Sequence, residues 1–162
     1  MKQQLQVDRR QQRTREAIRH AFTRLATSRR YDDFKVRDLI EAAGIGKSTF
    51  YEHYKSKDDV LRALIDGMLA ELADAATGQS NPARLKALTE HFWDNRRLGK
   101  SVFGQPLAPT VRRRLIELIE QRRRGRVRAA YVAAGQIGLL HGWLSGEIFA
   151  NVDEIVAALL SG

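Results

Sequence analysis

Apolar residues recur at helical spacing along most of the chain, and no segment alternates apolar and polar residues in the manner of a strand. Within residues 10–28, Ile18, Ala21, Phe22 and Leu25 would share one face of a helix, with arginines on the other faces. The pattern therefore predicts an all-α protein.

Two short helices are predicted over residues 36–42 and 47–54, joined by the turn 43–46 with the sequence Ala-Gly-Ile-Gly. Gly44 stands where a glycine ends a helix, and Ile45 would be the apolar plug between the two helices. Two short helices around a tight glycine turn make a helix-turn-helix, whose second helix enters the major groove of DNA.

Phe50 and Tyr54 are four residues apart and would hold the second helix against the core. The remaining side chains are small polar, basic and aromatic groups suited to base edges and phosphates, namely Lys47, Ser48, Thr49, Tyr51 and Glu52. Glu52 would either accept from the N4 amino group of cytosine or be solvated, and the sequence favours neither interpretation.

Further helices follow the helix-turn-helix. Ser56 and Asp59 resemble a capping box that opens a long helix to about Ala75, and Asn81-Pro82 and Asn151 with Glu154 mark two later helix starts. The later helices are predicted over residues 82–97, 109–124, 126–148 and 152–160, with a loop at 99–109.

Three parts of the chain are predicted from these elements. Residues 1–56 would form a DNA-binding domain, 57–75 a connecting helix, and 76–162 a helical domain for dimerisation and effector binding.

The charge is concentrated near the N-terminus. The chain carries 28 Lys and Arg against 19 Asp and Glu, a net charge of +9, and residues 1–30 alone account for +7. Such a surface attracts polyanions, nucleic acid first, although a basic segment can also be a plain solvated tail.

Several classes of function find no support in the composition. The absence of cysteine excludes disulfides and thiolate zinc sites, and the four histidines lack partners at metal-ligand spacing. Gly46-Lys47-Ser48-Thr49 imitates the end of a phosphate-binding loop, but Glu41 stands where that motif needs glycine. We therefore expect no enzyme activity, cofactor or metal. No apolar run follows the basic N-terminus, so a cytoplasmic location is expected.

Residues 35–57, Lys-Val-Arg-Asp-Leu-Ile-Glu-Ala-Ala-Gly-Ile-Gly-Lys-Ser-Thr-Phe-Tyr-Glu-His-Tyr-Lys-Ser-Lys, resemble the signature of the tetracycline-repressor (TetR) family, and the resemblance extends over about residues 10–70. It implies a three-helix DNA-binding domain followed by a helical regulatory and dimerisation domain of the short type. The DNA-binding residues that it implies are Lys35, Arg37, Lys47, Ser48, Thr49, Tyr51, His53 and Lys57.

Within that set, the resemblance implies different roles. Tyr51, His53 and Lys57 would contact phosphates, and residues 47–49 would begin the base-reading part of the recognition helix. Two positions depart from the family pattern: Lys35 replaces a Ser or Thr cap and would add a phosphate contact instead, and Gly46 replaces a common Ser cap.

A stripe of small residues in the helix predicted at 126–148 would let another helix approach closely, and its members are Gly135, Gly138, Gly142 and Gly146. The resemblance implies that this helix and the last one pair with their symmetry mates in a homodimer. Packing within one chain is the alternative. A membrane span is not expected, because polar residues such as Gln136, His141 and Glu147 interrupt the segment.

An effector pocket is predicted from aromatic and histidine side chains of the second domain, namely His91, Phe92, Trp93, Phe103 and Trp143. The alternative is that these side chains are core. The arginine runs 112–114 and 122–124 are expected on a helix surface, paired with Glu117 and Glu120.

The sequence therefore predicts a sequence-specific transcriptional regulator, a repressor released by a small-molecule effector, that binds a palindromic operator as a homodimer. The alternative is a helical co-regulator of the same fold that acts through a partner and not through its own operator.

Overall fold

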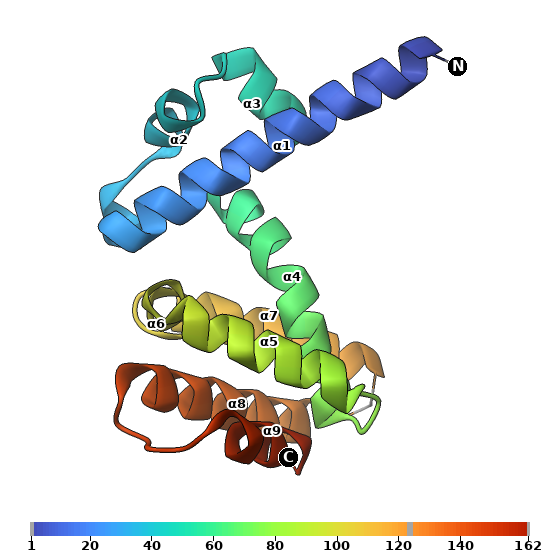
Figure 1. Cartoon of the computed structure of the whole chain (residues 1–162), viewed down its shortest axis with the longest axis vertical. Helices are drawn as coiled ribbons and strands as arrows, with labels where there is room; N and C mark the ends of the chain where they lie inside the picture. Colours follow the sequence, from blue (N-terminus) through green and yellow to red (C-terminus); the bar gives the residue numbers. More distant parts are fainter. Residues whose placement is uncertain (1, 123–124, 162) are drawn as a thin grey trace. The chain divides into compact units, whose positions relative to one another are not determined.

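The computed structural model describes residues 2–122 and 125–161, with side chains from residue 9 onward. All regular structure in this part of the chain is helical, which confirms the predicted all-α class (Figure 1). The chain forms two compact units, residues 1–64 and 65–162, and the division falls inside α4 (Lys57–Ala76).

The first unit is built on one long helix, α1 (Lys2–Ser28), with the shorter helices α2 and α3 on one side of it (Figure 1). A single 3-10 turn, η1 (Tyr31–Asp33), leads into α2 (Val36–Ala43), and a three-residue turn, 44–46, separates α2 from α3 (Lys47–His53). The predicted helix-turn-helix is present in these two short helices.

Buried apolar side chains from every helix meet in the first unit. Phe22 of α1 and Phe34 pack edge to face with ring centroids 5.6 Å apart, and Leu39 of α2 and Phe50 of α3 are fully buried. The Arg24 guanidinium donates a 2.6 Å hydrogen bond to the carbonyl of Ala42 at the end of α2. This bond ties α1 to a carbonyl that the helix itself leaves unpaired.

The second unit contains the end of α4 and five further helices: α5 (Pro82–Asp94), α6 (Arg96–Phe103), α7 (Ala108–Arg122), α8 (Arg126–Ser145) and α9 (Val152–Leu160). Two predicted caps are confirmed. The Asn81 side chain accepts from the backbone of Ala83 at 3.0 Å, and Asn151 and Glu154 form a reciprocal capping box.

The prediction of one helix to residue 97 and a loop at 99–109 is wrong. Helix α5 ends before its C-cap residue Asn95, whose side chain donates to the carbonyl of His91. A new helix, α6, begins at the next residue. Gly99 lies inside α6, where an added Cβ would stand 2.7 Å from Leu144 Cδ1. An added Cβ at Gly104 would stand 2.9 Å from His141 Nε2. Both glycines therefore allow α6 to approach α8 closely.

Two ion pairs join α7 to the part of α4 in the second unit. Arg114 contacts Asp66 through two hydrogen bonds of 2.8 and 2.9 Å, and Arg122 contacts Asp74 at 2.6 Å. The predicted partner Glu117 is present, 3.0 Å from Arg114. The main partners thus lie on α4, and Arg123 and Arg124 lie outside the described residues.

Candidate nucleic-acid interface

The turn between α2 and α3 is fixed by backbone hydrogen bonds. Gly44 has a φ of 65°, and its N–H donates to the carbonyl of Glu41 while that of Ile45 donates to Ile40. This pair of bonds is a Schellman motif, which requires the left-handed conformation that glycine adopts freely. Gly46 then starts α3 without a side-chain cap, as the sequence predicted.

Helix α3 is held in place by its buried face. Phe50 is completely buried, and the Tyr54 ring lies 6.1 Å from it between centroids. Ser48 and Glu52 are one turn apart on the opposite face, and both are exposed. Packing therefore anchors α3 and leaves polar groups on its outer face.

Tyr51 lies beside this outer face. Its side chain is 49% exposed, and its ring packs edge to face against Phe50 with centroids 5.4 Å apart. The contact restricts the ring while half of the side chain stays in solvent. Such a restrained phenol is suited to a phosphate contact.

The start of α2 presents two cations. The side chains of Lys35 and Arg37 are exposed, and Arg37 stands 4.0 Å from Asp38 in a loose ion pair. Lys35 cannot cap the helix with its ammonium, but its backbone N–H donates to the Asp38 carboxylate at 2.6 Å. Half of a capping box therefore remains at this end despite the missing Ser or Thr.

Lys57 is engaged inside the first unit. Its ammonium donates to the carbonyls of Tyr31 at 2.7 Å and Phe34 at 3.0 Å, and lies 4.0 Å from the centroid of the Tyr31 ring. The next residue, Asp58, accepts from the Tyr31 hydroxyl. Burial, and then the Asp58 carboxylate, raise the pKa of the Tyr31 phenol well above its usual range, so the hydroxyl stays a donor.

The phosphate contact predicted for Lys57 stays a prediction, and the structure shows an intramolecular role for the same ammonium. Two of the three ammonium donors are used within the chain, on the loop between α1 and α2. We therefore treat Lys57, together with Tyr31 and Asp58, as a latch that fixes this loop to the start of α4.

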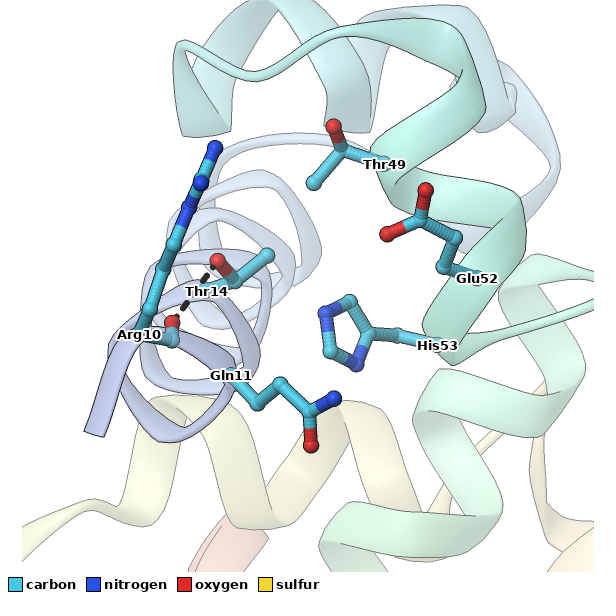
Figure 2. A pocket seen from close by; sticks show the side chains of 6 residues that line it. All are labelled: Arg10, Gln11, Thr14, Thr49, Glu52 and His53. Atoms are coloured by element: carbon cyan, nitrogen blue, oxygen red, sulfur yellow. Dashed lines mark hydrogen bonds between the residues drawn. The ribbon is translucent and has the colours of Figure 1, made fainter. Parts of the chain in front are cut away.

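A recess of about 300 Å³ separates α1 from α3. Figure 2 shows its two walls, with Arg10, Gln11 and Thr14 from α1 facing Thr49, Glu52 and His53 from α3. Thr49 and His53, both predicted as DNA contacts, are half-buried here and face α1. The three residues of α1 were not among the predicted DNA contacts, although they continue the helix face that carries Ile18 and Ala21.

Comparison with known proteins identifies this unit. The profile of the family described as bacterial regulatory proteins, tetR family, matches residues 18–64. Two curated relatives from Bacillus subtilis (strain 168) are uncharacterized HTH-type transcriptional regulators: YxbF, 38% identical over 78 residues, and YwcC, 42% identical over 53 residues. These matches cover 48% and 33% of this chain and only 20% and 24% of the relatives.

Residues 18–64 are therefore a DNA-binding region of the TetR family. This is a family of HTH-type transcriptional regulators and not of enzymes.

Solved structures extend the likeness of fold to the second unit. A TetR regulator from Streptococcus agalactiae 2603V aligns over 97% of both chains, with a TM-score of 0.66 and 23% identity. A putative TetR-family regulator from Syntrophomonas wolfei str. Goettingen aligns over 91% of both chains, with a TM-score of 0.61 and 18% identity. The dihydroxyacetone kinase operon activator DhaS has a TM-score of 0.54, 16% identity, and coverage of 91% of this chain and 92% of its own.

Most of the residues predicted to line an effector pocket are packed in the second unit. Phe92 and Phe103 are buried and meet edge to face at 5.2 Å, and Trp143 is buried and donates its indole N–H to the carbonyl of Ala150. Trp93 stacks on Trp143 at 4.9 Å and is 40% exposed, while His91 is exposed. These are the contacts expected of core.

The glycines predicted to form one dimer stripe differ in their surroundings. An added Cβ at Gly142 would stand 2.9 Å from Ile148 Cδ1 of the same chain, and Gly146 has a φ of 84° at the end of α8. Both therefore serve the turn that ends α8 at residue 145 and not at 148. Gly135 and Gly138 are exposed, with no atom within 4 Å of an added Cβ.

Other classes of site are not evident in the described part of the chain. No helix there is both long and apolar enough to cross a membrane. No cluster of three or more potential metal-ligating side chains occurs among the same residues.

Proposed function

We propose that this chain is a sequence-specific transcriptional regulator that binds a palindromic operator as a homodimer and represses transcription until a small-molecule effector binds. The observation that carries the proposal is the outer face of α3, where exposed Ser48 and Glu52 project from a helix anchored by buried Phe50. The match of residues 18–64 to the tetR-family profile supports a role for this helix as the recognition helix.

The proposed DNA contacts fall into two groups. Lys47, Ser48 and Thr49 would meet base edges and nearby backbone at the start of α3, while Tyr51 and His53 would contact phosphates. Lys35 and Arg37 at the start of α2 add positive charge, and Lys57 acts through the latch. Glu52 either accepts from cytosine or stays solvated, and the sequence preference of the Glu52→Ala variant decides between them.

An apolar face on α8 supports dimerisation. Its exposed positions between residues 127 and 138 carry Val127, Tyr131, Ala134, Gly135 and Gly138, and Arg128 is the only charged residue in that interval. Val127 is 87% exposed and Tyr131 is 74% exposed. A contiguous apolar face of this kind is typical of a protein interface, and in a dimer it would place two recognition helices in successive major grooves.

The effector and the sign of regulation belong to the proposal as well. An effector would act by binding the DNA-competent and incompetent states of the dimer with different affinity. Repression is proposed here, although one protein of similar fold is named as an operon activator. Binding to chromosomal DNA would place the protein in the cytoplasm.

Selection from a pool of random duplex DNA, at two salt concentrations, tests this function. We expect an enriched palindrome whose affinity falls steeply with salt, because Lys and Arg that neutralise phosphates release counterions. Salt-sensitive binding without an enriched motif would overturn the proposal and favour a co-regulator that acts through a partner.

A further inference from the structure

The recess between α1 and α3 adjoins the proposed base-reading face, because Thr49 and Glu52 line it and also belong to α3 (Figure 2). Its other wall is α1, outside the helix-turn-helix. Arg10 extends along this wall toward Thr49 (Figure 2). Whatever occupies the recess would thus contact the recognition helix and α1 together.

Two of the three side chains that form the α1 wall have no hydrogen-bonding partner among the described side chains. Neither the Arg10 guanidinium nor the Gln11 amide has a hydrogen-bond or ion-pair partner among residues 9–122 and 125–161. Thr14 differs, since its hydroxyl donates to the carbonyl of Arg10 at 3.0 Å. The α1 wall therefore offers guanidinium and amide donors to an outside acceptor.

The charge of the two walls determines where an anion would lie. Arg10 gives the α1 wall a positive charge, and exposed Arg9 and Arg13 stand nearby on the same helix. Glu52 gives the α3 wall a negative charge and would repel an anion from that side. An anion would therefore lie against α1, and Glu52 would be directed to groups that donate, such as base amino groups.

We propose that this recess is a phosphate subsite of the operator, in which the Arg10 guanidinium and the Gln11 amide donate to one phosphate of the DNA strand beside α3. Charge complementarity and continuity with the base-reading face support a DNA strand as the occupant. The guanidinium fork matches two phosphate oxygens, so the contact would fix the register of α3 along the groove as well as add affinity. The inference rests on the proposed function.

The test uses the full chain and the operator selected from the random pool. Each phosphate of one half-site is replaced in turn by an uncharged methylphosphonate, and affinity is measured for the unaltered protein, Arg10→Gln and Arg9→Gln. Arg9→Gln removes the same charge one residue away, at an exposed position that does not line the recess. Thermal unfolding of both variants checks that they remain folded.

We expect Arg10→Gln to weaken operator binding about tenfold and to reduce the slope of log affinity against log salt by about one. It should also lose sensitivity to the methylphosphonate at one particular phosphate. Arg9→Gln should keep that sensitivity. Gln11→Glu, which adds a negative charge to the same wall without changing its size, should weaken binding as well.

Two outcomes would overturn the subsite. Arg10→Gln could remain sensitive to every methylphosphonate that affects the unaltered protein, or the two arginine variants could behave alike, as generic charge would. Either result would leave the selected operator, and with it the proposed function, intact. A pool that yields no operator would instead remove the proposed function and the subsite together.

Discussion

The exposed faces of α3 and α8 differ in chemistry, although both helices are anchored by buried aromatic side chains. Phe50 fixes α3 and Trp143 fixes α8, and both are buried. The exposed residues of α3 are polar or charged apart from the ring of Tyr51, whereas those of α8 between residues 131 and 138 are apolar or glycine. One face is suited to a hydrogen-bonding polyanion and the other to a second protein surface.

The Gly138→Arg substitution should have the largest effect, because it would place a charge in the apolar face of α8. Gly138 is exposed with open space around it, so the monomer should tolerate Gly138→Arg. In the proposed dimer, the guanidinium would be buried without a partner, at a cost of about 3–5 kcal/mol, which is at least about a hundredfold in the dimer dissociation constant. Sedimentation would show monomer.

Gly138→Ala is the matched control, because it adds only a methyl group and removes a helical glycine. It should remain dimeric and stabilise the fold by about 0.5–1 kcal/mol. A fully dimeric Gly138→Arg protein would show that the apolar face of α8 is not the interface. Gly142 is unsuitable for this test, since a larger side chain there would meet Ile148 of its own chain.

The Lys57→Met substitution tests whether this cation of the first unit contacts DNA or stabilises the fold. Lys57→Met would leave the carbonyls of Tyr31 and Phe34 without the ammonium donor, so we expect the free energy of unfolding to fall by about 2 kcal/mol. The slope of log affinity against log salt should change little. Thermal unfolding and the salt dependence of operator binding measure the two effects separately.

Lys55→Met is the control for Lys57→Met, because Lys55 is exposed and lies two residues before it. It should leave the melting temperature nearly unchanged. A Lys57→Met protein with unaltered stability and a salt slope reduced by about one would restore the phosphate contact predicted from the sequence.

Thr49 and Tyr51 divide the proposed work of α3 between base edges and backbone. Thr49→Ala should change the preferred base pair at one position of the operator, by about 1 kcal/mol of discrimination. Tyr51→Phe should weaken binding to all sequences alike, because its hydroxyl would contact only phosphate. Repeating the pool selection with each variant measures both, and an unchanged motif with Thr49→Ala would argue against this placement of α3.

Features with local causes were predictable from the sequence. Gly44 after α2, the cap at Asn81 and the box between Asn151 and Glu154 depend on neighbouring residues, and the structure has all three. The role of Gly99 depends instead on its packing against Leu144 of α8, which is distant in the sequence. Because glycine marks loops as well as close helix contacts, the sequence could not distinguish a loop from α6.

The candidate site shows the same limit. The exposed side of α3 follows from the helical spacing of Phe50 and Tyr54, so Ser48 and Glu52 could be placed in advance. The hydrogen bonds of the Lys57 ammonium could not be predicted, because their acceptors lie on the loop between α1 and α2, far from Lys57 in the sequence. The wall that Arg10 contributes depends likewise on how α1 packs beside α3.

Substitutions at the two glycines of the turn between α2 and α3 should change stability with opposite signs, and Gly46 gives the smallest expected effect. Gly44 has a φ of 65°, so Gly44→Ala should destabilise the first unit by about 1–2 kcal/mol. Gly46 is extended, and an added Cβ would meet Thr49 Oγ1 at an ordinary 3.7 Å. Gly46→Ser should therefore supply the missing cap and stabilise α3 by a few tenths of a kcal/mol. Chemical denaturation resolves the first change readily, and a destabilised Gly46→Ser protein would mean that this glycine is needed for close contact and not tolerated as a weak cap.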